Sequence, residues 1–172
     1  MQIATLEKEF AYNWQSEECH LWFFNDGLPG YAWYVPKQDG YINVGLGGKA
    51  AKIKAKDAHL RDYWNSFTEM LAEKGLVCDA EYEPTGYSYY LRGSVDVIRD
   101  ENAFIIGDAV GLASIDMGEG IGPAVSSAIL AADAILNNAK YDLQQLSKLS
   151  VPGFFRNRSA SVAMPGLSAA NS

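Results

Sequence analysis

The sequence has few of the residues from which metal sites and disulfides are built. It contains two cysteines, Cys19 and Cys78, and two histidines, His20 and His59. Neither cysteine belongs to a Cys-x-x-Cys motif or to a Cys/His cluster, whereas a structural zinc site takes four such ligands at short spacings. We therefore expect free thiols and no metal site.

Basic stretches and long apolar runs are also missing. The chain has 14 Lys and Arg against 21 Asp and Glu, a net charge of -7, and no run of Lys or Arg forms a basic stripe. Nucleic acid is therefore not an expected partner. The longest apolar segment, 121–136, is broken by Ser126, Ser127 and Asp133 and is too short to cross a bilayer. Without a charged and then apolar leader, we expect a cytoplasmic protein with at most peripheral membrane contact.

A glycine-rich stretch at 103–123 is the most informative part of the chain. The unbroken apolar run before Gly107 and Asp108 predicts a strand buried on both faces. Pro123 suits the first turn of a helix over 123–137, whose free N–H groups would lie just beyond the loop 118–120, an arrangement that binds anions. The alternative is an ordinary strand-loop-helix unit whose glycines only turn corners. One helix face, expected to pack closely, holds Val125, Ile129, Ala132 and Leu136.

A β-hairpin is predicted earlier in the chain, with strands at 31–38 and 41–47. Asp39 and Gly40 between them suit a two-residue type I′ turn. That turn would set the register so that one side of the ribbon carries three cross-strand pairs, Trp33 with Leu46, Val35 with Val44, and Lys37 with Ile42. Tyr34 and Pro36 would then lie on the other side.

The remaining pattern predicts an α+β fold with an antiparallel sheet covered by helices. Further strands are expected at 2–10, 18–24 and 81–91, an amphipathic helix at 56–74 and a short helix at 141–149. The strand at 81–91 is rich in tyrosine and places Tyr87 and Tyr89 on one face. We expect a sheet-containing part over 1–100, a second part over 101–150 and a loosely ordered tail over 151–172.

Two motifs in this order resemble the carboxyl-terminal half of the FAD-dependent geranylgeranyl reductase family, within the para-hydroxybenzoate hydroxylase-like flavoproteins. The segment 29–37, Pro-Gly-Tyr-Ala-Trp-Tyr-Val-Pro-Lys, resembles the family's Tyr-x-Trp-x-Phe-Pro segment, with Val35 in place of Phe. The segments 107–111 and 118–124 resemble its second flavin-contacting motif. The resemblance covers residues 18–138.

The resemblance implies roles for individual residues. The cofactor-binding set would be Gly107, Asp108, Gly118, Gly120, Ile121 and Gly122, with Asp108 accepting hydrogen bonds from FAD and the loop amides facing the flavin. The walls of a hydrophobic substrate cavity would be formed by Tyr31, Trp33, Pro36, Tyr87 and Tyr89. Hydride would pass from reduced FAD to a prenyl or other hydrophobic substrate. No spacing selects a proton donor among Tyr34, Cys19 and the tyrosines near Ser88.

One departure from the family is large. A complete member opens with a strand and a GxGxxG turn that hold the ADP half of FAD, and nothing in residues 1–25 resembles them. The chain therefore looks like a fragment or one subunit of a split protein, and it should bind FAD weakly or not at all by itself. Its partner would be a second chain supplying the GxGxxG half, or a second copy in a homodimer. The alternative is a catalytically silent module that binds hydrophobic ligands or serves assembly.

Overall fold

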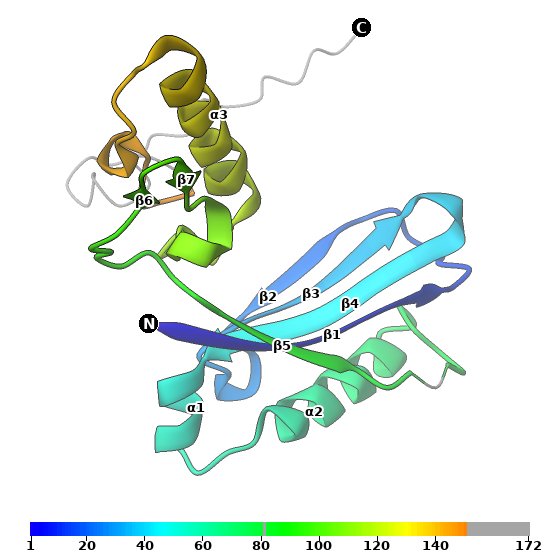
Figure 1. Cartoon of the computed structure of the whole chain (residues 1–172). Coiled ribbons are helices and arrows are strands. Elements are labelled where there is room, and N and C mark those ends of the chain that lie inside the picture. The colour runs from blue at the N-terminus through cyan, green and yellow to red at the C-terminus, as the bar shows by residue number, and fades with distance from the viewer. Residues whose placement is uncertain (81, 151–172) are drawn as a thin grey trace, which may run out of the picture.

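The computed structural model describes residues 1–80 and 82–150. A five-stranded antiparallel sheet has the order β2-β3-β4-β1-β5 (Figure 1). With the helices described below, this confirms the predicted α+β class. The five strands are β1 (Gln2–Ala11), β2 (His20–Phe23), β3 (Gly30–Lys37), β4 (Tyr41–Lys49) and β5 (Thr85–Tyr90).

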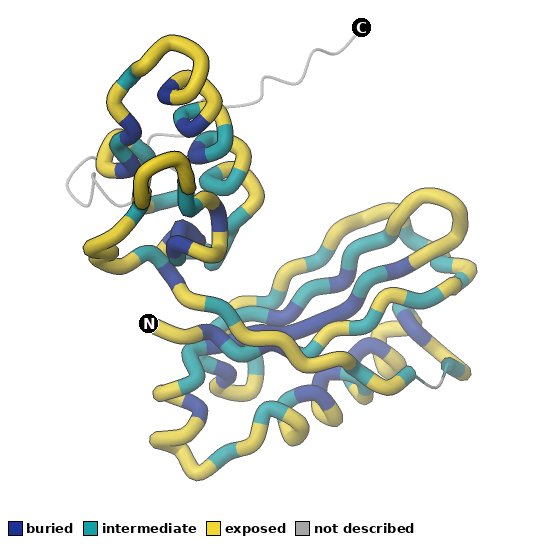
Figure 2. The backbone as a smooth tube through the Cα atoms, viewed as in Figure 1, coloured by how far each residue is buried: buried dark blue, intermediate teal, exposed yellow. Residues whose placement is uncertain are grey.

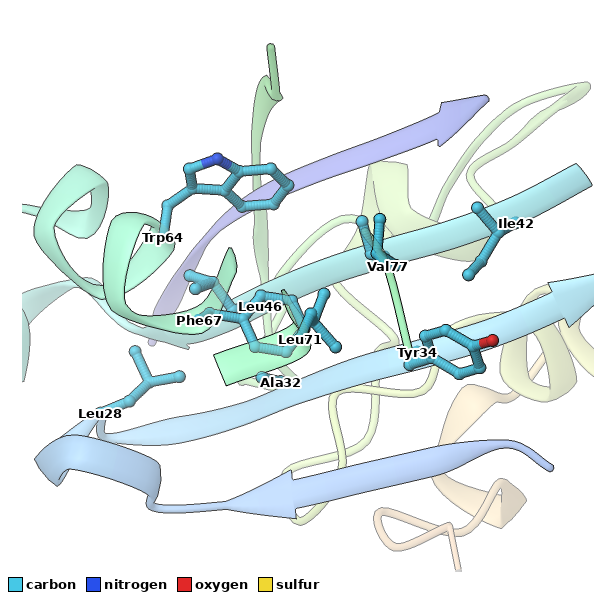
Figure 3. Close-up of a cluster of buried hydrophobic side chains, with 10 residues drawn as sticks. Leu28, Ala32, Tyr34, Ile42, Leu46, Trp64, Phe67, Leu71 and Val77 are labelled. Carbon is cyan, nitrogen blue, oxygen red and sulfur yellow. The ribbon is translucent and has the colours of Figure 1, made fainter. Parts of the chain in front are cut away.

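Two helices cover one face of this sheet. They are α1 (Ala50–Ala55) and α2 (Leu60–Glu73). The helix predicted over 56–74 corresponds to α2, which begins four residues after the predicted start. Asp57, whose φ of 52 is not helical, separates the two helices, and α1 was not predicted. The core between helices and sheet is shown in Figure 3, and β4 is its buried centre in Figure 2. It consists of Leu28, Ala32, Tyr34, Ile42, Val44, Leu46, Trp64, Phe67, Leu71 and Val77.

The predicted hairpin exists, but its predicted register is wrong by one residue. Tyr34 pairs with Val44, and Lys37 pairs with Tyr41, so the loop has three residues rather than two. Asp39 and Gly40 adopt positive φ as a type I′ turn requires, and the additional loop residue is Gln38. A shift of one residue exchanges the faces of a strand. Tyr34 therefore shares the α2 face with Val44, and Trp33 lies with Gly45 on the opposite face.

The second part of the chain has little regular structure. It contains β6 (Arg99–Asp100), β7 (Ala103–Phe104), the 3₁₀ turns η3 (Gly107–Val110) and η4 (Leu143–Gln145), and α3 (Ile121–Asn137). The buried strand predicted before Gly107 is wrong: β7 has two residues, its neighbour is β6, and Ile106 is 40% exposed. The helix predicted at 141–149 is only the turn η4. The predicted tail over 151–172 lies outside the described residues.

The helix α3 packs through a different face from the one predicted. Its buried residues are Ser127, Ala131 and Ala134. The predicted packing face is instead open, with Ile129 63% exposed and Leu136 80% exposed. Small side chains allow α3 to lie close to η3, and the large aliphatic side chains are left in solvent.

Two connections join the second part to the free face of the sheet. Leu91, directly after β5, forms a parallel bridge with Ala113. The Tyr31 hydroxyl of β3 donates a 2.9 Å hydrogen bond to the Met117 carbonyl. Together they hold the loop 112–120 over the sheet face opposite α2 (Figure 1). No helix in the described ranges is long and apolar enough to span a bilayer.

Candidate functional site

An open cleft lies between the sheet and the start of α3, with a volume of about 620 Å³. It brings together residues predicted as two separate sets, the flavin-contacting loop and the substrate wall. From the first set come Asp108, Gly118, Gly120 and Ile121, and from the second come Trp33, Tyr87 and Tyr89. The side chain of Asp108 therefore faces a cleft, as a ligand-binding role requires.

The sheet wall of the cleft is built on a close contact between Trp33 and Gly45. The two residues pair across β3 and β4, and a Cβ atom on Gly45 would come within 2.2 Å of the indole. The indole N–H donates a 2.7 Å hydrogen bond to Asn43 Oδ1, which fixes the ring in this position. The ring therefore lies over Gly45 of β4 and lines the cleft.

A smaller cavity of about 80 Å³ lies beneath the loop 115–118. Tyr31 and Leu91 contribute to its wall, and Gly47 and Gly48 line its floor. The cleft and the cavity are neighbours, because four residues line both: Thr5, Trp33, Tyr89 and Gly118. This arrangement suits a ligand that occupies the cleft and a slender apolar group that enters the cavity.

The loop before α3, which lines the cleft, contains unpaired amides. Among the described residues, the backbone N–H groups of Gly120 and Ile121 have no acceptor. The N–H of Gly122 is taken by Glu119 Oε1 at 2.6 Å, and the N–H of Gly107 donates to Ser127 Oγ. Of the predicted cofactor residues, Gly107 and Gly122 therefore use their backbone N–H groups in hydrogen bonds within the protein. The N–H groups of Gly120 and Ile121 are available to a ligand.

Two tyrosines beside the loop are held in the neutral form. Burial raises the pKa of Tyr89 to about 12, with smaller contributions from Tyr31 and Asp108, and burial also raises the pKa of Tyr31. Both hydroxyls therefore remain hydrogen-bond donors at neutral pH. The Tyr31 hydroxyl donates to the Met117 carbonyl. The Tyr89 hydroxyl lies against Gly118, where an added Cβ atom would be 2.6 Å from the hydroxyl oxygen.

Asp116 organises the loop and was missed in the sequence analysis. Its carboxylate accepts backbone hydrogen bonds from Met117 and Ser150. Desolvation is the largest single influence and opposes the charged form, but these hydrogen bonds and one from the Ser114 side chain together outweigh it and lower the pKa of Asp116. Thr5 and Glu7 of β1 were also missed, because only the pairing of β1 beside β4 brings them to the cleft.

Three residues considered for the site lie elsewhere. Pro36 pairs with Ile42 on the α2 side of the sheet, because side chains alternate along β3 and positions 33 and 36 therefore face opposite ways. Tyr34 is fully buried in the core beneath α2, and Cys19 is exposed before β2. No group of three or more His, Cys, Asp and Glu side chains able to hold a metal comes together within residues 1–80 and 82–150.

Residues 1–79, which contain β1 to β4 and both helices, match the family described as the geranylgeranyl reductase catalytic domain. The matched region belongs to the geranylgeranyl reductase family. The match contains the Tyr-x-Trp segment and bears out the predicted family resemblance, while the glycine-rich loop lies beyond the matched residues. Within this geranylgeranyl reductase domain lie Tyr31 and Trp33, which form one wall of the cleft.

The similarity to two named relatives extends over more residues than the 79 of the family match. A menaquinone reductase from Mycolicibacterium smegmatis is 31% identical over 118 residues, which is 67% of this chain and 28% of that protein. A digeranylgeranylglycerophospholipid reductase from Methanosarcina acetivorans is 28% identical over 122 residues, again 28% of its length. The chain thus spans little more than a quarter of the curated relatives it matches.

A solved structure shares the fold. The geranylgeranyl bacteriochlorophyll reductase-like protein from Thermoplasma acidophilum superimposes with a TM-score of 0.59 at 21% identity. The superposition covers 80% of this chain and 35% of that chain. It therefore includes residues beyond the 79 of the family match, and it supports the arrangement of the sheet and the second part.

Proposed function

We propose that the chain is the substrate-facing part of a flavin-dependent reductase and that it acts on a hydrophobic, isoprenoid-bearing substrate. The observation that carries this proposal is the cleft, which is lined by Asp108, by Gly120 and Ile121 with their free amides, and by Trp33 and Tyr89. The substrates named for the two reductase relatives, menaquinone and digeranylgeranylglycerophospholipid, both carry long apolar chains.

The residues present fit one end of FAD. Free amides at the start of α3 suit the electron-rich edge of an isoalloxazine ring, and the positive end of the helix dipole favours negative charge there. A carboxylate at Asp108 can accept hydrogen bonds from hydroxyl groups of the ribityl chain. The sequence supplies no GxGxxG turn for the ADP half, so we expect FAD to bind weakly to this chain alone.

The protein's contribution to the reaction is binding and orientation. When bound, FAD supplies the hydride chemistry. Trp33 and Tyr89 confine the substrate beside the loop, and the cavity under 115–118 excludes water from the apolar chain. The neutral hydroxyl of Tyr89 offers a hydrogen bond at the junction between cleft and cavity.

We further infer that a second polypeptide covers the exposed face of α3. Ile121, Ile129 and Leu136 are each more than half exposed, and β7 has only the two-residue β6 as its neighbour among the described residues. A partner chain carrying a GxGxxG unit would bury this face and supply the missing contacts to FAD. A homodimer formed through α3 is the alternative.

Flavin titration tests the proposal. On addition of FAD, flavin fluorescence should change in a saturable way, and Asp108→Ala should weaken binding about tenfold because a charge-assisted hydrogen bond is lost. Asp96→Ala, which removes an exposed carboxylate outside the cleft, should leave binding unchanged. If no flavin binds, alone or with a co-expressed GxGxxG chain, the silent hydrophobic-ligand module is the better account.

A further inference from the structure

One corner of this acidic protein combines a lysine cluster with exposed aromatic side chains. Although no run of consecutive basic residues exists, four lysines lie within the eight positions 49–56, in and around α1. Phe23, the last residue of β2, and Phe24, which follows it, are 50% and 72% exposed. We call this the basic-aromatic corner; its residues are Phe23, Phe24, Lys49, Lys52, Lys54 and Lys56.

The fold joins the two segments directly. Lys56 Nζ donates a 2.6 Å hydrogen bond to the carbonyl of Gly27 in the turn η1 (Asn25–Gly27). Figure 1 shows this turn beside α1 at one end of the sheet. Two acidic residues lie in the same segments, Asp26 and Asp57, so the lysines outnumber the carboxylates there. In a chain of net charge -7, this local excess of positive charge is a departure.

Phe24 is held in an unfavourable position twice over. Its φ of 58 lies in the left-handed region, which costs a residue with a side chain and suits Gly or Asn. Its ring is also largely in solvent rather than packed in the core. A residue that is unfavourable in both backbone and burial points to a role outside the folded domain itself.

The corner adjoins the apolar cavity of the proposed site. Pro29 and Gly30, which follow the aromatic turn, line that cavity, and so do Gly48 and Lys49, which precede α1. Both halves of the corner are therefore only a few residues from the cavity wall. A molecule held at the corner could pass an apolar chain into the cavity by a short route.

We propose that the basic-aromatic corner docks on the surface of an anionic lipid bilayer. Lysines beside exposed aromatic rings are the side chains that bind such surfaces, the lysines by attraction to anionic headgroups and the rings by insertion among the acyl chains. The additional idea that the substrate's chain enters from that bilayer rests on the proposed function. The docking itself does not.

Vesicle co-sedimentation of the full chain tests the attraction between the lysines and anionic headgroups. The protein should sediment with phosphatidylcholine vesicles that contain phosphatidylglycerol and not with phosphatidylcholine alone, and added salt should release it. Lys52→Ala with Lys54→Ala should weaken binding about fivefold for each lysine removed. Lys74→Ala with Lys140→Ala makes the same change in net charge outside the corner and should have little effect.

The role of the aromatic side chain is tested with a variant whose backbone conformation suits the new residue. Phe24→Gly relieves the left-handed backbone and should fold at least as stably, yet it should lose most vesicle binding. Asn138→Gly, a matched exchange at φ 53 after α3, should keep binding intact. Equal binding to both vesicle types, or equal losses in the variants and their controls, would overturn the proposal.

If the corner instead binds a protein partner, the folded protein should not bind vesicles at all. That result would also overturn the proposal. Flavin titration of the same preparations separates the two proposals. Phe24→Gly and the double lysine variant leave Asp108 and the loop amides untouched, so they should bind FAD as the wild type does. Loss of lipid binding with flavin binding retained, or the reverse, identifies which proposal fails.

Discussion

The indole of Trp33 lies directly over Gly45 on the neighbouring strand, so close that any side chain at position 45 would occupy the volume of the ring. The glycine is therefore what lets an aromatic ring line the cleft without rising into it. Asn43, two residues away on the same strand, holds the indole N–H. Three residues on two strands thus define the aromatic wall on which the proposed site depends.

Gly45→Ala should destabilise the fold by about 1–3 kcal/mol, because the added methyl group forces Trp33 out of its position. Gly86→Ala is the matched control: on β5, the nearest atom to a new Cβ is Leu6 Cδ2 at 3.6 Å, an ordinary contact. Urea unfolding of both variants measures the difference. Equal stabilities would contradict the close contact.

Gly118→Ala combines backbone strain at φ 68 with a clash against the Tyr89 hydroxyl. We expect a loss of about 1–3 kcal/mol beyond that of Gly40→Ala, which has φ 72 but nothing near its Cβ. Tyr89→Phe in the Gly118→Ala background removes the clashing oxygen and should restore part of the stability. A strictly additive double variant would show that the two residues do not touch.

Tyr34 and Tyr31 should respond oppositely to loss of the hydroxyl. The Tyr34 hydroxyl is buried and has no hydrogen-bond partner among the described residues, so Tyr34→Phe should be neutral or stabilising by about 1 kcal/mol. Tyr31→Phe removes the hydrogen bond to Met117 and should cost about 1 kcal/mol. Thermal unfolding of the two variants gives the comparison, and a destabilised Tyr34→Phe would argue for a partner to that hydroxyl.

Stability should fall as the pH rises through the alkaline range. Burial raises the pKa of Tyr89 and of Tyr82 to about 12, above the value of about 10 in an unfolded chain. Between these values the unfolded chain has released its protons and the native chain has kept them, so unfolding becomes more favourable. Urea midpoints across this range should decline less steeply for Tyr89→Phe. An unchanged decline would place the Tyr89 hydroxyl in solvent.

The sequence predicted the elements of the sheet better than their pairing. Alternation of apolar residues located the strands, and the Asp39-Gly40 pair located the hairpin, but the turn pair alone suggested two loop residues. The cross-strand pairs decide otherwise: the observed register places Tyr34 against Val44 under α2 and Trp33 against Gly45 over the cleft. The pair of Trp33 with position 45 requires a glycine there, and the turn sequence contains no information about that requirement.

The residues that line the candidate site could be predicted where they belong to one loop, and could not be predicted where strand pairing brings them to the cleft. Asp108 and Gly120 follow from the glycine-rich motif, and both face the cleft. Thr5 reaches the cleft only because β1 lies beside β4, a long-range pairing with no local signal. The exposed face of α3 was mistaken for its packing face, because apolar periodicity marks a face to be covered without saying what covers it.

The most direct test of the flavin assignment is a nuclear magnetic resonance titration of the ¹⁵N-labelled chain with FMN and with FAD. Because the described residues offer contacts to the isoalloxazine end only, both should bind with similar affinity and shift the amide signals of Gly118, Gly120 and Ile121. Asp108→Ala should reduce those shifts. Shifts confined to residues outside the cleft, or none for either flavin, would contradict the assignment.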